Sequence, residues 1–380
     1  MRILILSANT GEGHNSTAKA LMEVFAQQGV DCQMEDTLAY LNKGISKLIA
    51  GGHVTIYRYC SKLFDITYRR MEKDMDPEEY SPIYEFLSLG TAKLYKAILQ
   101  GDFDAILCVH SFSAMMMTKI RRRWGLKIPT YLLTTDYTCW PTSEQCDVDY
   151  YFLPSKDQAA AFIRAGHSRL QLIPTGIPVR QAFYHREDQS LVRQRLGLPQ
   201  AGNVVLLMCG SMGCGPIEGV ARALAEKLPK DAMVVAVCGS NQKLYHAMSQ
   251  IQNPRLRVLG YTKNIPEYMD AADLIVTKPG GLSSTEAASK ALPMVFLNTI
   301  GACETRNFDY FLSRGYALGS SKPEEVVALA VQLAADPRKR QQMSEVLQKD
   351  FCINSAQVIV DRMCKDGAAY RESQMAAAVR

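Results

Sequence analysis

Short apolar runs alternate along this chain with segments of helical periodicity, and that alternation constrains the fold more than any other feature. In the first half the apolar runs are Arg2–Ser7, 105–109, 130–134 and Tyr150–Leu153, and the first of them is followed by a helical pattern over 15–28. Such short runs separated by helices are typical of parallel strands covered on both faces. The sequence therefore predicts an α/β fold with a doubly wound sheet.

The second half repeats the alternation. Its apolar runs are Val204–Met208, Met233–Val237, 257–259, Leu274–Thr277 and Met294–Leu297, and two or three helices without strands follow Lys322. The two halves are separated by Pro174, Gly176, Pro178 and a polar stretch to about Gly202. Such a segment is expected at a domain junction in a chain of 380 residues. We expect an N-terminal Rossmann-like domain over 1–178, a C-terminal one over 179–350, and a final helix and tail over 351–380 whose last residues are loosely held.

Composition excludes several classes of protein. The net charge of +5 is too small for an obligate nucleic-acid binder, and no run of 18 apolar residues is present to span a membrane. The 11 cysteines include no Cys-x-x-Cys pair, which argues against a zinc site and a disulfide framework. The amino-terminal apolar stretch is too short for a secretory signal, so we expect a cytoplasmic protein.

An aromatic and basic segment lies in the least regular region, between residues 38 and 99. On a helix, one face would carry Tyr57, Phe64 and Tyr68, and a neighbouring face would carry Arg58, Lys62 and Arg69, with Arg70 next in sequence. This pattern fits a helix at a membrane surface, but it equally fits an ordinary helix with a solvated edge. A second basic cluster, residues 119–127, is typical of a solvated helix end.

The first glycine-rich turn, SANTGEGHNS, follows a strand and opens a helix. It is not a dinucleotide fingerprint, because Ser16 replaces the third glycine, and the chain contains no phosphate loop of the GxxxxGK[ST] type. His14 lies in or beside the first helical turn, where the helix dipole disfavours the imidazolium. A neutral His14 could accept a proton from a hydroxyl, or it could merely cap the helix.

Two further glycine-rich turns in the second half offer anion sites. The first is Met208 to Pro216, and the second is Thr277 to Glu286, which combines free backbone N–H groups, the cation of Lys278 and the carboxylate of Glu286. A sugar nucleotide needs these three kinds of group for its phosphate oxygens, its leaving group and its ribose hydroxyls. Glu304 and Asn307, three residues apart, could bind neighbouring sugar hydroxyls from one helix face.

These motifs carry a resemblance. SANTGEGHNSTAKAL, TDYTCWP, IPTGIPVR, CGSMGCG and above all TKPGGLSSTEA closely resemble the family of monogalactosyldiacylglycerol synthases and processive diacylglycerol glucosyltransferases, and more distantly the N-acetylglucosaminyltransferase that forms lipid II. The resemblance runs from Arg2 to about Leu333. It implies a GT-B architecture, with two Rossmann-like domains facing a cleft, a lipid acceptor in the first, a UDP-sugar in the second, and a last helix that crosses back to the first.

The resemblance also assigns roles to residues. His14 is similar to the catalytic histidine of the family. The donor-binding residues it implies are Arg180, Ser211, Gly213, Ile265, Lys278, Gly280, Gly281, Glu286, Glu304 and Asn307, and the acceptor-binding ones are Gly11, Gly13 and Asp136. No metal ligand and no cofactor other than the UDP-sugar substrate is implied.

The chain departs from the family pattern at two places. Plant-like members carry two histidines after the Thr-Asp pair, which the segment Cys139 to Gln145 lacks, and Cys303 stands where many members have glutamine. These departures leave the acceptor and the donor sugar open. The acidic patterns Asp102-Phe103-Asp104 and Asp147-Val148-Asp149 precede expected strands, and we interpret them as turn residues and not as a metal site.

The leading hypothesis is an inverting glycosyltransferase that moves a hexose from a UDP-sugar to diacylglycerol on the inner face of the cell membrane, with peripheral contact to anionic lipid. Three alternatives stay open: a transferase with a soluble or polyprenyl-linked acceptor, a UDP-sugar 2-epimerase, and a catalytically silent UDP-sugar sensor. The sequence leaves open which sugar moves, whether addition repeats and the oligomeric state.

Overall fold

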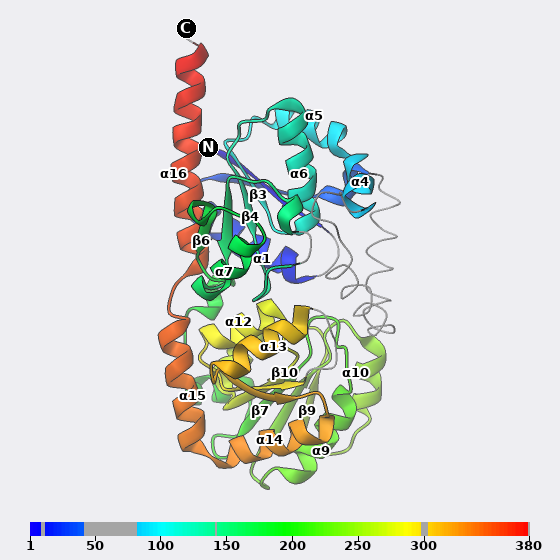
Figure 1. The fold of residues 1–380 in the computed structure, drawn as a ribbon. Helices are drawn as coiled ribbons and strands as arrows, with labels where there is room; N and C mark the ends of the chain where they lie inside the picture. Colours follow the sequence, from blue (N-terminus) through cyan, green and yellow to red (C-terminus); the bar gives the residue numbers. More distant parts are fainter. Residues whose placement is uncertain (9–11, 42–81, 141–142, 298–302, 379–380) are drawn as a thin grey trace. The chain divides into compact units, whose positions relative to one another are not determined.

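The computed structural model describes residues 1–8, 12–41, 82–140, 143–297 and 303–378, and it divides the chain into two compact units. Unit 1 comprises Met1–Arg180 together with Ile353–Arg380, and unit 2 comprises Gln181–Cys352 (Figure 1). The division after Arg180 lies close to the junction expected after residue 178. Gly11 and the aromatic and basic segment lie outside the described residues.

Unit 1 is built on a parallel sheet of six strands in the order β2-β1-β3-β4-β5-β6. The strands are β1 (Arg2–Ser7), β2 (Asp31–Asp36), β3 (Ala105–Cys108), β4 (Thr130–Leu133), β5 (Tyr150–Leu153) and β6 (Leu172–Pro174). The α-helices are α1 (Glu12–Gln27), α4 (Pro82–Ser88), α5 (Thr91–Gly101), α6 (Ser111–Trp124), α7 (Ala159–Arg164) and α16 (Ser355–Ala378), and the short 3-10 helices are η1 (Thr37–Tyr40), η2 (Ser143–Gln145), η3 (Lys156–Gln158) and η4 (Arg169–Gln171).

Helices cover both faces of the unit 1 sheet. Helices α4, α5, α6 and α7 bury one face, where side chains such as Leu94 and Met116 pack on Leu4 and Ile106. Helices α1 and α16 bury the other, with the α16 residues Ala356, Ile359, Val360 and Met363 in the same core cluster as β1 and β3. The last helix of the chain therefore belongs to the amino-terminal unit, along which it lies in Figure 1.

Within the expected final helix and tail over 351–380, helix α16 continues past Gly367 to Ala378. Gly367 is buried, and a Cβ placed there would lie 3.4 Å from Cβ of Asp104. Arg371 donates from Nε to Oδ1 of Asp104 at 2.7 Å. A close approach and an ion pair thus hold the first part of this segment against unit 1, while residues 371–377 are exposed.

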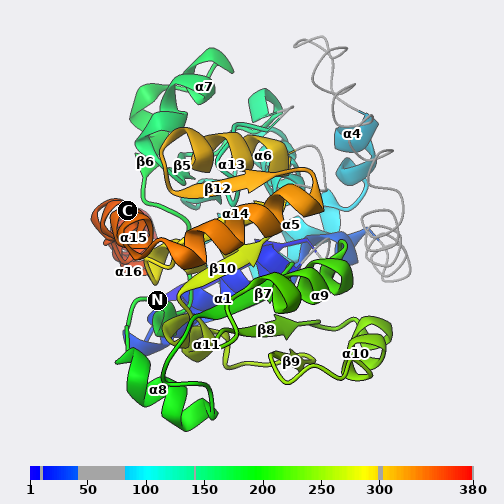
Figure 2. The same ribbon diagram turned by 90° about the horizontal axis from the view of Figure 1, so that it is seen from below.

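Unit 2 carries a second parallel sheet of six strands, in the order β12-β11-β10-β7-β8-β9. The strands are β7 (Val204–Met208), β8 (Met233–Val237), β9 (Leu256–Leu259), β10 (Leu274–Thr277), β11 (Met294–Leu297) and β12 (Ala317–Ser320). The helices are η5 (Gln181–Phe183), α8 (Gln189–Leu196), α9 (Ile217–Lys227), α10 (Gln242–Ser249), α11 (Ile265–Ala271), α12 (Gly281–Ser289), α13 (Cys303–Ser313), α14 (Pro323–Ala335) and α15 (Pro337–Asp350). Helices α9 and α14 pack on each other and on one face of the sheet, as Figure 2 shows.

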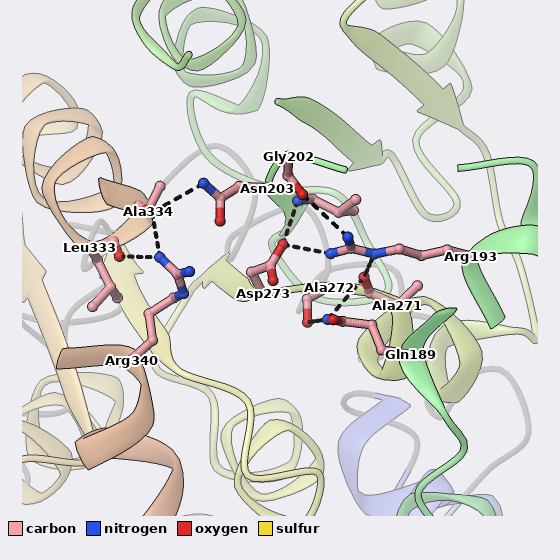
Figure 3. Close-up of polar contacts among 11 residues, drawn as sticks. Gln189, Arg193, Gly202, Asn203, Ala271, Ala272, Asp273, Leu333, Ala334 and Arg340 are labelled. Atoms are coloured by element: carbon pink, nitrogen blue, oxygen red, sulfur yellow. Dashed lines mark hydrogen bonds and ion pairs between the residues drawn. The ribbon is translucent and has the colours of Figure 1, made fainter. Parts of the chain in front are cut away.

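A group of polar contacts closes the amino-terminal edge of the unit 2 sheet (Figure 3). Arg193 of α8 donates from Nη2 to the carboxylate of Asp273 at 2.6 Å, and from Nε to the Ala271 carbonyl at 2.9 Å. The same carboxylate accepts the backbone N–H of Val204, the first residue of β7, at 2.7 Å. Because all strands of the sheet are parallel, this structural network lies at the opposite edge from the glycine-rich turns that follow β7 and β10.

The two acidic patterns have structural roles. Asp104 accepts the backbone N–H of Arg2 at 2.7 Å, and Asp149 accepts both terminal nitrogens of Arg121, at 2.6 and 2.7 Å, and the backbone N–H of Thr130. Asp147 lies 3.6 Å from Nη2 of Arg122. Asp104 and Asp149 thus bind backbone N–H groups at the starts of strands, and two arginines of the basic cluster have anionic partners.

Over the described residues, no helix combines the length and the apolarity needed to cross a bilayer. The same ranges contain no group of three or more histidine, cysteine, aspartate or glutamate side chains placed to hold a metal ion.

Candidate active site

In unit 1, the predicted catalytic histidine lies at the carboxyl ends of the central strands. In the order β2-β1-β3, strand β2 lies on one side of β1 and strand β3 lies on the other, so the direction of the connections changes at β1. Such a switch point is where open parallel sheets bind ligands. His14 lies in the first turn of α1, after β1; Val109 and His110 follow β3; Thr135 and Asp136 follow β4. Three strand ends therefore supply one cluster of polar groups.

Contacts made by Nδ1 of His14 define its tautomer. This nitrogen lies 2.7 Å from the carbonyl oxygen of Val109 and 3.2 Å from Oγ1 of Thr135. A carbonyl oxygen can only accept a hydrogen bond, so Nδ1 carries the proton and donates it. In the neutral ring Nε2 is then the basic nitrogen, which is the arrangement that a general base requires.

The surroundings of His14 favour its neutral form. Burial lowers the pKa of His14 below its ordinary value, and this effect outweighs the opposite influences of the Asp136 carboxylate and the Val109 carbonyl on the same pKa. The position in the first turn of α1 acts in the same direction as burial, because a helix amino terminus disfavours a cation. His14 is consequently unprotonated and able to accept a proton near pH 7.

His110 is a neighbour of His14 that the sequence analysis did not identify. The two rings meet edge to face, with centroids 4.6 Å apart and an interplanar angle of 69°. Nδ1 of His110 accepts the backbone N–H of Phe112 at 3.0 Å and so caps α6. The signal was present in the sequence, since His110 follows the apolar run 105–109 directly and so had to lie at the same sheet edge as His14.

The predicted acceptor residues are described in part. Asp136 influences the pKa of His14 and so lies near it. Gly13 lies in α1, and a Cβ built on it would meet no atom within 4 Å. The roles of Gly13 and Asp136 in binding an acceptor stay predictions.

In unit 2, two of the predicted donor turns lie side by side. Strands β7 and β10 are neighbours at the switch point of this sheet, so the turns that follow them are adjacent. Gly210, in the first turn, has a φ of +70°, and a Cβ placed there would lie 2.8 Å from Cε of Lys278 in the second. The positive φ favours glycine at this position, and the absence of a side chain leaves room for Lys278.

The turn that contains Ser211 and Gly213 also packs on the turn after β8. A Cβ on Gly213, whose φ is +57°, would meet the Cys238 carbonyl oxygen at 2.1 Å. The Ser211 carbonyl accepts the N–H of Ser240 at 2.8 Å, and the Gly213 carbonyl accepts from Nδ2 of Asn241 at 3.0 Å. The turn is therefore held rigidly, with the Ser211 side chain exposed.

Lys278 and Glu304 form a buried ion pair. Nζ of Lys278 donates to Oε1 of Glu304, and the two side chains are only 15% and 4% exposed. Gly280 lies beside the pair, since a Cβ there would be 3.2 Å from Nζ of Lys278 and 3.7 Å from Oε1 of Glu304. The structure thus brings together three residues that the sequence assigned to donor binding.

The other predicted donor residues lie at separate places. Gly281 is the first residue of α12, Glu286 follows in the same helix, Ile265 begins α11, Asn307 is buried in α13, and Arg180 is the residue at which the first segment of unit 1 ends. Their roles in binding a donor stay predictions. Pro216, the last residue of the first of the two glycine-rich turns, precedes α9 as its N-cap.

Comparison with family models matches both units. Residues 14–179 match the model described as monogalactosyldiacylglycerol (MGDG) synthase, and residues 204–349 match the C-terminal domain of glycosyltransferase family 28. Among curated relatives, the processive diacylglycerol beta-glucosyltransferase of Bacillus thuringiensis strain Al Hakam is 27% identical over 371 residues, which cover 96% of this chain and 94% of the relative. The protein of the same description from Bacillus cereus strain AH820 is 27% identical over 366 residues, covering 95% and 92%.

Solved structures share the fold at low sequence identity. MurG of Acinetobacter baumannii has a TM-score of 0.63 at 16% identity, over 96% of this chain and 99% of that one. The UDP-GlcNAc 2-epimerase of Neisseria meningitidis has a TM-score of 0.62 at 13% identity, over 96% and 100%. The glycotransferase of kitacinnamycin has a TM-score of 0.65 at 13% identity, over 96% and 98%.

The two doubly wound parallel sheets and these structural likenesses together define the GT-B fold, which transferases and epimerases share. Within that class, the family models and the curated relatives decide between the two chemistries. The amino-terminal part of the chain matches the monogalactosyldiacylglycerol synthase model, the carboxyl-terminal part matches the C-terminal domain of glycosyltransferase family 28, and the chain is a glycosyltransferase.

Proposed function

We propose that this enzyme moves a hexose from a UDP-sugar to a lipid acceptor, and that the acceptor is diacylglycerol. The observation that carries the catalytic part is the hydrogen bond from Nδ1 of His14 to the Val109 carbonyl, which leaves Nε2 as the base. The substrate class is supported by the names of the curated relatives, processive diacylglycerol beta-glucosyltransferases that align with nearly the whole chain.

The proposed step is a single displacement at the anomeric carbon. The acceptor hydroxyl oxygen forms the new bond to that carbon, its proton passes to Nε2 of His14, and the bond between the sugar and the β-phosphate oxygen breaks. UDP leaves with the bonding electrons. A UDP-α-sugar attacked from the opposite face would yield a β-glycoside.

Leaving-group charge would be met by backbone N–H groups at the amino ends of α9 and α12, which follow the two glycine-rich turns of unit 2. Arg180, Ser211, Gly213, Gly280 and Gly281 are the residues that we propose for this phosphate site, and Ile265 and Glu286 those for uracil and ribose. We propose that the donor substrate is needed but no cofactor or metal, because these N–H groups supply the stabilisation that a cation otherwise supplies.

We further propose that the enzyme acts at the inner face of the cell membrane through peripheral contact with anionic lipid. A diacylglycerol acceptor resides in a bilayer, so the enzyme must reach that surface. The aromatic and basic segment Tyr57 to Arg70 has the composition of such a contact. Vesicle co-sedimentation tests this: a variant with Arg58, Lys62, Arg69 and Arg70 neutralised should bind anionic vesicles less than the wild type, and equal binding would contradict it.

A UDP-release screen tests the reaction. The full chain is incubated with UDP-glucose, UDP-galactose or UDP-GlcNAc, with and without diacylglycerol vesicles, and the lipid product is identified by mass. We expect UDP release that depends on the vesicles and on His14. Epimer formation from UDP-GlcNAc alone would favour the epimerase alternative, release with only a soluble or polyprenyl-linked acceptor would favour another transferase, and nucleotide binding without release would favour a sensor.

A further inference from the structure

The buried ion pair of unit 2 limits the positive charge that Lys278 can offer to a ligand. Its Nζ donates to Oε1 of Glu304, so the cation and the anion are joined within one small region. A side chain in such a pair presents little net charge to a third group, because the fields of the two ions largely cancel beyond the pair. Lys278 is therefore poorly suited to act as an independent cation for a diphosphate.

Two glycines leave the space that the Lys278 side chain occupies. A Cβ on Gly210 would lie 2.8 Å from Cε of Lys278, and a Cβ on Gly280 would lie 3.2 Å from its Nζ. The side chain thus passes beside two residues that have no side chain, toward the first turn of α13 where Glu304 lies. The Lys278 side chain therefore extends toward Glu304, to which its Nζ donates.

A paired carboxylate in this position retains accepting capacity. A carboxylate has two oxygens and about four lone-pair positions, so it can accept hydrogen bonds from a lysine and from a hydroxyl at the same time. A positioned and charged acceptor binds a sugar hydroxyl more strongly than a neutral one does.

We propose that Lys278 is a positioning residue for Glu304: it holds this carboxylate in an orientation to accept a hydroxyl of the donor hexose, and it does not itself bind the diphosphate. This inference rests on the proposed function, because it assumes a UDP-hexose in unit 2. It separates the sugar from the nucleotide part of the donor, which makes it testable by binding alone.

The experiment measures the dissociation constants of UDP and of the UDP-hexose that the UDP-release screen identifies, by calorimetry on the full chain. The variants are Lys278→Met, Glu304→Gln and the double variant. The matched control is Lys322→Met, which removes a lysine paired with a glutamate, Glu325, on the surface of the same unit. We expect Lys278→Met and Glu304→Gln each to weaken UDP-hexose binding about tenfold or more, the cost of one hydrogen bond to a charged group.

Binding of UDP itself should change by less than about threefold in the same variants, since the sugar is the group that Glu304 contacts. The double variant should bind the UDP-hexose no more weakly than Glu304→Gln alone, because both substitutions remove one interaction. The control should match the wild type.

Three results would overturn the inference. One is an equal loss of affinity for UDP and for the UDP-hexose in Lys278→Met, which would place the lysine on the diphosphate. Another is a double variant whose loss is the product of the single losses. The third is weakened binding of UDP by the double variant. This variant has no unpaired buried charge, so it decides the question if Lys278→Met does not fold. A wild type that binds no uridine nucleotide would instead contradict the proposed function itself.

Discussion

At the scale of single residues, the proposed role of His14 as a base depends on atoms from three strand ends. Without the Val109 carbonyl, either ring nitrogen could carry the proton. Without burial, the pKa of the imidazole would lie nearer to its ordinary value. The surroundings of His14 therefore give a helix-start histidine a defined tautomer and a lowered pKa.

Replacing the base should remove most of the turnover. We expect His14→Ala to lower kcat by about 10²–10⁴-fold, the usual contribution of a positioned general base. UDP release with saturating donor and acceptor measures it. His246→Ala, which removes an exposed histidine of α10 in the other unit, is the matched control and should leave turnover unchanged. Full turnover in His14→Ala would refute the assignment.

The pH profile should report the lowered pKa of His14. Protonation removes the base, and because the pKa is shifted down, activity should persist through pH 6.5, the ordinary value for histidine, and fall only at lower pH. The Asp136 carboxylate favours the imidazolium, so Asp136→Asn should lower the pKa further and move the acid limb of kcat/KM to still lower pH. Asp361→Asn in α16 is the control. A limb that moves to higher pH in Asp136→Asn would contradict this electrostatic relation.

At the scale of elements, the sequence predicted the central strands and missed edge strands. The expected strands β1, β5, β7, β8, β10 and β11 are confirmed at their bounds, because both of their faces are buried and they appear as continuous apolar runs. Strands β2, β6 and β12 were not predicted. β2 and β12 are edge strands in which most residues are only partly buried, so their sequences are mixed, and the three residues of β6 include a proline.

A buried ion pair joins two helices of unit 2. Lys290, at the end of α12, donates to Oδ2 of Asp270 in α11 at 2.7 Å and also to the His185 carbonyl, and both charged side chains are almost fully buried. Removing one member of such a pair leaves the other charge unsolvated in the interior. The pair thus ties α11, α12 and the segment before α8 together.

Breaking this pair should destabilise unit 2 strongly. We expect Asp270→Ala to lower the free energy of unfolding by about 3–5 kcal/mol, as measured by urea denaturation. The control is Glu218→Ala, whose partner Arg222 lies on the surface, where the expected loss is about 1 kcal/mol or less. Similar decreases in the free energy of unfolding of the two variants would show that burial of the Lys290 pair does not increase its effect on stability.

At the scale of the whole molecule, the two units differ in how the chain builds them. Unit 2 is one continuous stretch, whereas unit 1 needs both ends of the chain. Helix α16 supplies Ile359, Val360 and Met363 to the unit 1 core, and Asp366 accepts the Tyr131 hydroxyl at 2.6 Å. The amino-terminal sheet therefore cannot be fully covered until the carboxyl-terminal helix has been made.

Truncation tests this dependence. A chain ending at Cys352 should lose the cooperative unfolding of unit 1, because each large core side chain removed costs about 2–5 kcal/mol, while unit 2 keeps its fold. Hydrogen exchange in β1 and β3, compared with β7 and β8, distinguishes the two units. A chain ending at Ser373, which keeps Arg371 and removes only exposed helix, should behave as the full chain. Protected β1 and β3 in the shorter chain would contradict the prediction.

The sequence by itself determined the local features: the apolar runs of the central strands, the glycine-rich turns that follow them, the presence of His14 and Glu304 at helix starts, and the place of Lys278 directly after a strand. These follow from periodicity and turn chemistry, which act over a few neighbouring residues. Only the tertiary structure decided that Val109 sets the tautomer of His14, that His110 lies against it, and that Lys278 is paired with Glu304. Those contacts join residues far apart in the chain, and no local pattern encodes which strand end or helix start a side chain will meet.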